Sequence, residues 1–341
     1  MKSTRLQRIP HFLVALCLAA AGTLATGLAS AQEVRLRASH QWPGGQGDIR
    51  DEMVQIIARE AKAADVGLEI RVYPGASLYK PREQWNAMAR DRLDISAFPL
   101  AYAGGQHPEF NLTLMPGLVK NHDHAQRLND SEFMDRIVDI MNEDNVIVLA
   151  HTWLAGGFVT KGDECILEPD DVEGMQMRAA GKSFNQLLAA AGASIASMPS
   201  SEIYSALQTG VLDGANTSSS SFVSYRIYEQ AGCLTAPGDN ALWFMYEPIL
   251  MSKASFERLD AEQQEVLREA GKKAEDFAYE AAKEADQKLV NTYERNGVKV
   301  VTMNAEQFQM WRDVAQRSSY DAFVEETPNG QELLDLALSV D

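Results

Sequence analysis

A helical pattern near the C-terminus sets the strongest constraint on how this chain can fold. It begins at Asp260, where Gln263 three residues later completes a capping box, and it ends near Asn296, just before Gly297. About 36 residues with a rise of about 1.5 Å each give a helix of roughly 54 Å, which is longer than the roughly 30 Å diameter of a small domain. The chain of 341 residues is long enough for about two domains. We therefore expect this helix to run along two lobes.

The rest of the chain after Glu33 alternates short β-rich runs with amphipathic helical stretches. Strands are expected at residues 34–38, 68–73, 93–98, 146–150 and 193–196, and helices at 49–64, 82–90, 183–191 and 201–209. Strands separated by helices favour an α/β fold in which a largely parallel sheet is covered on both faces. The adjacent Gly156 and Gly157, soon after a fully apolar strand, suit a crossing between the lobes.

The first residues have the pattern of a secretory signal. Lys2, Arg5 and Arg8 precede an apolar run at 12–28, and the small residues at 29–31 form a cleavage pattern. A retained membrane anchor is the alternative, but glycines and threonines interrupt the run, which falls short of the ~20 strongly apolar residues that a span needs. We predict that residues 1–31 are a cleaved signal peptide.

Charge and cysteine content narrow the function further. The chain has 48 acidic against 31 basic residues, a formal net charge of -17, which disfavours nucleic acid and anionic lipid as partners. Cys165 and Cys233 are the only cysteines outside the predicted signal. An even pair in an oxidising compartment predicts one structural disulfide, and two unpaired buried thiols are the alternative.

The sequence carries no convincing enzyme motif. It lacks the Gly-x-Ser-x-Gly, His-Glu-x-x-His and Gly-x-Gly-x-x-Gly patterns. Gly181-Lys182-Ser183 resembles the end of a phosphate-binding loop, but Gln176 stands where that motif requires glycine. A solvated pair is a better interpretation of His122 and His124 than a metal site, because no further ligand lies at a typical spacing. We expect no catalytic step, no cofactor and no metal.

Two segments carry a family resemblance. Residues 174–181 read Gly-Met-Gln-Met-Arg-Ala-Ala-Gly, and residues 202–214 read Glu-x-Tyr-x-Ala-Leu-Gln-x-Gly-x-x-Asp-Gly. Together with the signal, the Tyr-Pro-Gly at 73–75 and the long helix, they resemble the solute-binding proteins of TRAP transporters, the DctP family. The resemblance implies a two-lobed periplasmic binding protein, type II-like, with mixed sheets and an interlobe cleft. It also implies that a small organic acid is bound and delivered to the small and large membrane subunits of a permease.

The resemblance also suggests how the chain divides into lobes. We expect lobe I to contain residues 32–155 and about 243–280, and lobe II to contain residues 156–242 and about 281–341. The protein is expected to be a periplasmic monomer.

Arg178 is the expected anchor for the ligand's carboxylate. A guanidinium can donate two parallel hydrogen bonds to a carboxylate and stays charged when it is desolvated. Asn216 matches the family position that supplies an amide donor to the same carboxylate. An ordinary salt bridge for Arg178 and a turn-forming role for Asn216 are the alternatives.

The expected ligand is a monocarboxylate with an apolar or aromatic body. By the resemblance, Gly157 stands where many family members carry a second arginine. Aromatic rings at Trp42, Phe98, Tyr102 and Trp153 are expected to form the pocket wall. Alternatively, each ring packs in a core or at a lobe edge.

Three other functions stay open on the sequence alone. The chain could report ligand occupancy to a sensor protein, it could be a secreted enzyme on the same fold, or it could bind sugars or peptides without a carboxylate anchor. The sequence does not name the ligand or the permease's coupling ion.

Overall fold

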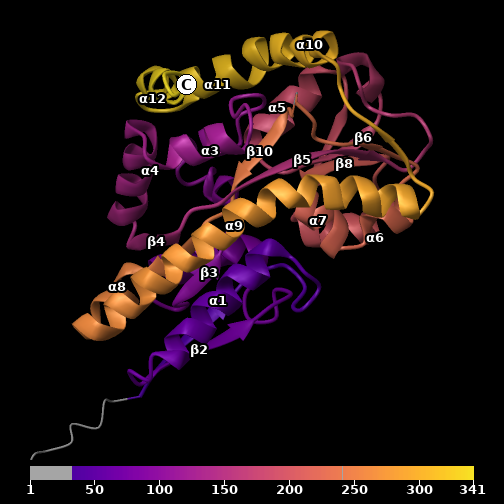
Figure 1. Cartoon of the computed structure of the whole chain (residues 1–341). Coiled ribbons are helices and arrows are strands. Elements are labelled where there is room, and N and C mark those ends of the chain that lie inside the picture. The colour runs from indigo at the N-terminus through magenta and orange to yellow at the C-terminus, as the bar shows by residue number, and fades with distance from the viewer. Residues whose placement is uncertain (1–32, 240) are drawn as a thin grey trace, which may run out of the picture. The chain divides into compact units, whose positions relative to one another are not determined.

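A computed structural model describes residues 33–239 and 241–341 (Figure 1), so the predicted signal peptide lies outside the described residues. The first of two sheets has the strand order β2-β1-β3-β11-β4. β1 pairs in parallel with β2 and β3, whereas β11 is antiparallel to β3 and β4. Its strands are β1 (Val34–Ser39), β2 (Leu68–Tyr73), β3 (Ile95–Ala97), β4 (Val146–Ala150) and β11 (Ile249–Ser252).

The second sheet has the order β12-β9-β5-β8-β6-β7, and β10 also pairs with β5. β6 is parallel to β7 and β8, while β5 is antiparallel to β8, β9 and β10. Its strands are β5 (Trp153–Thr160), β6 (Gln176–Ala179), β7 (Ser194–Ser197), β8 (Gly214–Ser218), β9 (Cys233–Thr235), β10 (Trp243–Tyr246) and β12 (Lys299–Val301). The α/β fold with mixed sheets is confirmed.

Helices cover both sheets. The α-helices are α1 (Ile49–Ala63), α2 (Gln84–Ala89), α3 (His122–Asn129), α4 (Glu132–Glu143), α5 (Lys182–Ala190), α6 (Ile203–Gln208), α7 (Ser219–Ser224), α8 (Lys253–Glu257), α9 (Ala261–Arg295), α10 (Ala305–Ala315), α11 (Asp321–Glu326) and α12 (Gly330–Leu338). Shorter helical turns are η1 (Pro81–Glu83), η2 (Leu100–Ala103), η3 (Pro108–Leu114), η4 (Pro169–Val172), η5 (Ser200–Glu202), η6 (Ile227–Gln230) and η7 (Gln316–Tyr320). Among the described residues, none of these helices combines the length and apolar character that crossing a bilayer requires.

Helix α9 is the long helix that the sequence predicts. Asp260 caps it with the predicted capping box to Gln263, and Gly297 follows its end with a φ of 78°. It packs against α1 and β4 at the first sheet and against α7 and β12 at the second (Figure 1). Its buried face consists largely of alanine, and at Gly271 a Cβ atom would lie 2.0 Å from the carbonyl oxygen of Leu149. Small residues therefore let the helix lie close to the sheets.

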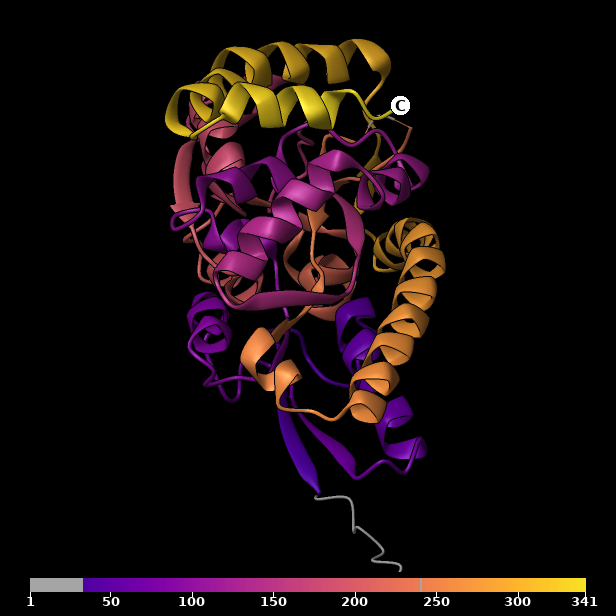
Figure 2. The same ribbon diagram turned by 90° about the vertical axis from the view of Figure 1, so that its left-hand side faces the viewer.

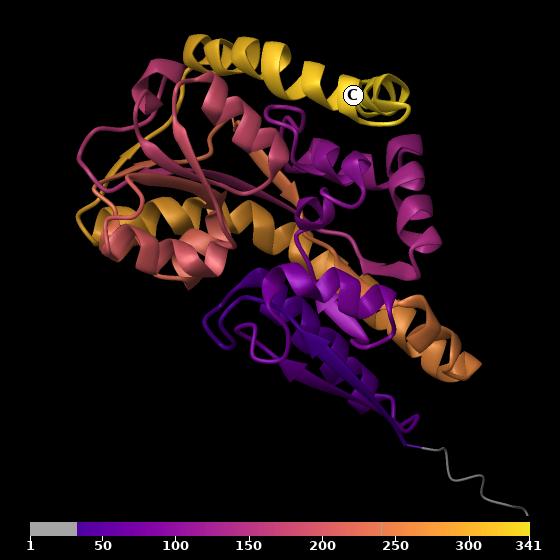
Figure 3. The same cartoon turned by 180° about the vertical axis from the view of Figure 1, so that it is seen from behind.

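The C-terminal helices α10, α11 and α12 pack on helices from the middle of the sequence. Helix α12 packs against α4, α11 packs against η3, and α10 packs against α5, as Figures 2 and 3 show from two sides. One hydrophobic core joins aromatic side chains of these segments with those of the second sheet, including Phe133, Phe158, Phe184 and Trp311. The region from η2 to α4 thus shares its core with the second sheet.

The predicted crossing at Gly156 and Gly157 is wrong in its position. Both glycines lie inside β5, where they pair with Ser218 and Thr217 of β8. A Cβ atom at Gly156 would lie 2.0 Å from the Thr217 carbonyl oxygen, and one at Gly157 would lie 2.0 Å from that of Thr235. The glycines are needed because backbone approaches closely there, and the chain passes between the sheets at His151 and Thr152 instead.

The predicted disulfide is confirmed. Cys165 in the loop after β5 is bonded to Cys233 at the start of β9, with Cα atoms 5.3 Å apart. The bond closes a sequence separation of 68 residues. It therefore ties an otherwise irregular loop to the second sheet.

His151, at the crossing, should make stability depend on pH. Its Nδ1 lies 2.6 Å from the Tyr246 hydroxyl, and burial lowers the pKa of His151 from 6.5 to about 4. The folded state therefore keeps the ring neutral while the unfolded state takes up a proton, so this contribution is complete above pH 6.5 and is lost as the pH falls toward 4. We expect it to cost about 2 kcal/mol between pH 7 and pH 5.

Urea unfolding at both pH values checks this expectation. In His151→Gln the fall in unfolding free energy between pH 7 and pH 5 should shrink by about that amount. The His122→Gln variant serves as a control, since His122 is a second histidine that bonds to a carboxylate, Asp286, at 2.9 Å. An equal pH dependence in the wild type and His151→Gln would contradict the assignment.

Candidate functional site

Arg178 lies in β6, between β7 and β8, with 1 % of its surface exposed. Its Nε donates to the carbonyl of Met198 at 3.0 Å and its Nη1 to the carbonyl of Asn216 at 2.5 Å. Among the described residues no carboxylate lies within 4.0 Å of the guanidinium. Burial lowers the pKa of Arg178, yet a guanidinium remains charged in proteins. The side chain is thus a buried cation without a paired acid.

Tyr102 in η2 connects this arginine to the preceding segment. Its hydroxyl accepts from Arg178 Nη2 at 3.0 Å and from the backbone N–H of Ser200 at 3.1 Å. With both bonds accepted, the hydroxyl keeps its own proton for donation. The ring of Phe98 lies edge-on to Tyr102, with centroids 6.2 Å apart, and the exposed Arg82 stacks on Tyr102 at 4.9 Å.

Asn216 in β8 presents an unpaired amide beside Arg178. Its backbone carbonyl binds the guanidinium, whereas its fully buried side-chain Nδ2 and Oδ1 have no hydrogen-bond partner among the described residues. The amide of Gln41 is also buried without a described partner, and the Gln41 carbonyl accepts from the Tyr225 hydroxyl at 2.9 Å. Buried polar groups are nearly always paired, so the unpaired amide of Asn216 beside a buried cation indicates a ligand site.

The two tryptophans have their contacts elsewhere. Trp42 stacks on Arg50, 4.0 Å from its guanidinium carbon, and donates to Ser221 at 3.3 Å. Trp153 donates to Asn129 at 2.9 Å and packs on Tyr246. The structure therefore brings together Arg178, Asn216 and Tyr102, with Phe98 behind them. No described interaction joins either tryptophan to that group.

Sequence reasoning missed a buried ionic cluster around Arg50. Arg50 lies in the first turn of α1 and donates to Asp48 at 2.8 and 2.6 Å, to Glu247 at 2.5 Å and to Ser218 at 2.9 Å. Ser218 follows Asn216 by two residues, so both lie on one face of β8. Two features of the sequence could have indicated this cluster. A cation in a first helical turn is unfavourable without a partner, and Glu247 is the only charged residue in the apolar run 241–252.

The cluster holds its two acids in different electrostatic states. Burial opposes ionisation of Asp48, but its bonds to Arg50 lower the pKa of Asp48 overall. Burial raises the pKa of Glu247, although Arg50 and Arg178 both act in the opposite direction. Glu247 is therefore the less well compensated of the two charges.

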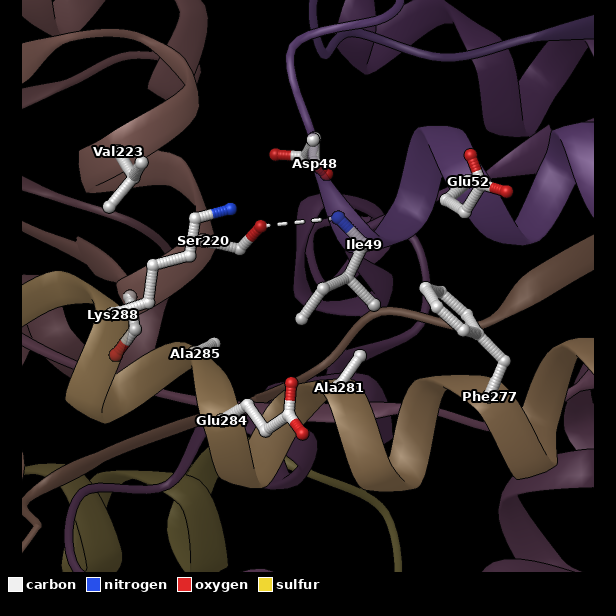
Figure 4. Close-up of a pocket in the computed structure, with 12 residues that line it drawn as sticks. Asp48, Ile49, Glu52, Ser220, Val223, Phe277, Ala281, Glu284, Ala285 and Lys288 are labelled. Carbon is white, nitrogen blue, oxygen red and sulfur yellow. Dashed lines mark hydrogen bonds between the residues drawn. The ribbon is translucent and has the colours of Figure 1, made fainter.

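A separate cavity of about 240 Å³ lies where α1, α7 and α9 meet (Figure 4). The backbone N–H of Ile49 donates to the Ser220 hydroxyl at 3.3 Å in its wall, and Glu284 and Lys288 of α9 line the opposite side. None of the residues predicted to bind ligand lines this cavity.

Comparison with known proteins gives the family. Residues 52–327 match the model of bacterial extracellular solute-binding protein, family 7, DctP. A solute-binding protein of Albidiferax ferrireducens is 38 % identical over 322 residues, covering 93 % of this chain and 95 % of the relative.

Solved structures agree with this assignment. A TRAP periplasmic solute-binding protein of Rhodoferax ferrireducens with bound malonate is 37 % identical, with a TM-score of 0.86 over 89 % of this chain and 98 % of that one. One of Chromohalobacter salexigens with bound d-glucuronate is 25 % identical, with a TM-score of 0.81 over 90 % and 100 %. The chain belongs to the DctP family of TRAP transporter solute-binding proteins.

Proposed function

We propose that this protein is the periplasmic receptor of a TRAP transporter and that it binds a small organic acid through Arg178. The observation that carries the proposal is the buried guanidinium without a paired acid, next to the unpaired amide of Asn216. A carboxylate placed there would accept hydrogen bonds from both side chains and would form a direct ion pair with the guanidinium. The bound malonate and d-glucuronate of the two related structures both carry carboxylates.

The ligand is a monocarboxylate with an apolar or aromatic body. A second carboxylate would meet the negative charge of Glu247, whose electrostatic attraction reaches Arg178. The rings of Phe98 and Tyr102 beside the anchor offer apolar surface to the rest of the ligand. This ligand class rests on those two features.

Binding couples to closure of two lobes, one built on each sheet. Arg50 of α1 bonds to Ser218, and the Gln41 carbonyl accepts from the Tyr225 hydroxyl, so hydrogen bonds join segments of the first sheet to segments of the second. A ligand that contacts both sides favours the closed state. The region from η2 to α4, which the sequence assigns to lobe I, goes with lobe II in this proposal, because it shares its core with the second sheet. The signal at 1–31, the monomeric state and the absence of a catalytic step remain as proposed from the sequence.

The closed, loaded receptor then docks on the small and large membrane subunits of a permease. No observation favours a sensor protein as the recipient over a permease. The family assignment supports the permease, because its members are solute-binding proteins of transporters.

A thermal-shift screen of small carboxylic acids against their primary amides tests this function. The cognate acid should raise the melting temperature at millimolar concentration, while its amide should leave it unchanged, since the amide lacks the charge that Arg178 pairs. Equal shifts for an acid and its amide would contradict a carboxylate anchor. A shift with neutral sugars alone would do the same.

A further inference from the structure

Glu247 is a buried carboxylate, and only one of its two oxygens accepts a hydrogen bond from a described residue. It follows β10 directly, its backbone N–H donates to Thr152 at 2.9 Å, and 4 % of its surface is exposed. Its Oε2 accepts from Arg50 Nη1 at 2.5 Å. No hydrogen bond to Oε1 is present among the described residues. A buried carboxylate has about four lone-pair sites, so its hydrogen-bonding capacity is only partly used.

The structure places this carboxylate beside the proposed anchor. Arg50 bonds to both Glu247 and Ser218, and Ser218 shares a strand face with Asn216. Glu247 and Arg178 each respond to the other's charge, but no nitrogen–oxygen distance between them is within 4.0 Å. The two opposite charges are therefore close enough to influence each other but do not form a direct ion pair.

The four buried charged side chains around the proposed anchor sum to zero before any ligand binds. Arg50 and Arg178 supply two positive charges, and Asp48 and Glu247 supply two negative charges. The neighbouring His40–Asp51 pair, 3.1 Å apart, adds no net positive charge to this sum. A lone carboxylate would thus leave one uncompensated buried negative charge, which is expensive in a protein interior. A ligand carrying an ammonium group as well as a carboxylate would keep the sum at zero.

We propose that Glu247 determines specificity by binding the ammonium group of a ligand whose carboxylate binds Arg178. The preferred ligand is then a small zwitterionic amino acid with an apolar side chain. This inference rests on the proposed function and deepens it, because a monocarboxylate with an apolar body becomes one that also carries a cation. Dicarboxylates are disfavoured, since their second carboxylate would face Glu247 instead of a cation.

The exposed Arg82 is the alternative partner for a second carboxylate. It stacks on Tyr102 and donates to Ser197 at 3.1 Å, at the rim of the site. Water screens an exposed cation, so Arg82 compensates a buried charge poorly. Malonate, which the Rhodoferax ferrireducens relative holds, therefore belongs in the test as the dicarboxylate.

Calorimetric titration of the full mature protein tests the proposal. The twenty L-amino acids are titrated first, and the tightest binder is compared with its 2-hydroxy analogue, its deamino analogue and malonate. The amino acid should bind at least about 10-fold more tightly than the hydroxy acid and about 100-fold more tightly than the deamino acid. Malonate binding more tightly than every amino acid would overturn the proposal.

The Glu247→Gln variant separates recognition from a structural role. It should lower the affinity for the amino acid by about 10- to 100-fold. The amino, hydroxy and deamino acids should then bind with nearly equal affinity. Glu275→Gln is the matched control, because Glu275 is also an acid whose pKa burial raises, but it bonds to the backbone of His151. An equal loss for all three ligands in Glu247→Gln would mean a purely structural role and would overturn the proposal.

Proton exchange in the wild type supplies a readout that needs no variant. Titration in two buffers of different ionisation enthalpy should show no net proton uptake with the amino acid and about one proton taken up with the deamino acid. The groups that face Glu247 are Arg50 and Asp48 from the start of α1 and Arg178 from β6. Proton uptake of the same size with both ligands would contradict the role of Glu247. If carboxylates bind through Arg178 but none of these differences appears, only this inference fails; if no carboxylate binds, the proposed function fails as well.

Discussion

Arg178→Ala is expected to lower the affinity for the cognate acid by roughly 30- to 5,000-fold, because a buried carboxylate that loses its partner costs about 2–5 kcal/mol. Arg178→Lys should bind with intermediate affinity, since an ammonium keeps the charge but cannot form the two parallel bonds of a guanidinium. Calorimetric titration of the acid into each purified variant measures both effects.

Two controls separate a loss of binding from a loss of folding or of charge. Arg178 also bonds to two backbone carbonyls and to Tyr102, so the melting temperature of each variant must show that it folds. Arg268→Ala removes an arginine whose side chain is 56 % exposed on α9, and it should leave the affinity unchanged. Wild-type affinity in a folded Arg178→Ala protein would remove Arg178 from the binding site.

Arg50→Met is expected to lower the free energy of unfolding by about 3–5 kcal/mol, because it leaves Asp48 and Glu247 as uncompensated buried charges. Arg50 is itself fully buried and bonds to both acids, so solvent cannot replace it. The loss should be smaller at pH 5 than at pH 8, since unpaired buried carboxylates are neutralised by protonation as the pH falls. Urea unfolding at the two pH values measures the difference.

Arg59→Met is the matched control on the same helix. Arg59 pairs with Glu52 at 2.7 Å, but its side chain is 60 % exposed. An exposed pair contributes at most about 1 kcal/mol, so this variant should stay close to the wild type. If Arg50→Met cost as little as Arg59→Met, the buried cluster would have no stabilising role.

Locally encoded features of the fold could be predicted from the sequence. The ends of α9 follow from Asp260, Gln263 and Gly297, each of which acts within one helical turn, and the structure places the helix between those residues. The disulfide followed from the even number of cysteines outside a predicted export signal. Such signals need no knowledge of distant parts of the chain.

Features that depend on distant contacts could not be predicted in the same way. Arg50 and Glu247 are 197 residues apart, and nothing local to either one names the other as its partner. The partners of Trp42 and Trp153 are likewise distant in the sequence, since Trp42 bonds to Ser221 and Trp153 to Asn129. Gly156 and Gly157 suggested flexibility, whereas the structure uses them for close backbone approach.

In the candidate site, too, some residues could be predicted from local sequence motifs and others only from the fold. Arg178 and Asn216 stood out because they lie in motifs with a known pattern, and the structure places them on neighbouring strands in contact with each other. The position of Tyr102 beside them required the fold, since 76 residues separate it from Arg178. Glu247 could have been noticed in the sequence as a lone charge in an apolar run, but its burial and its bond to Arg50 required the structure.

A crystal structure of the protein with its cognate acid bound tests the central claim most directly. We predict that the ligand's carboxylate oxygens lie within about 3.2 Å of the Arg178 guanidinium and of Asn216 Nδ2, at ordinary hydrogen-bond distance. A ligand carboxylate bound instead in the cavity between α1, α7 and α9, with Arg178 still bonded only to protein groups, would contradict it.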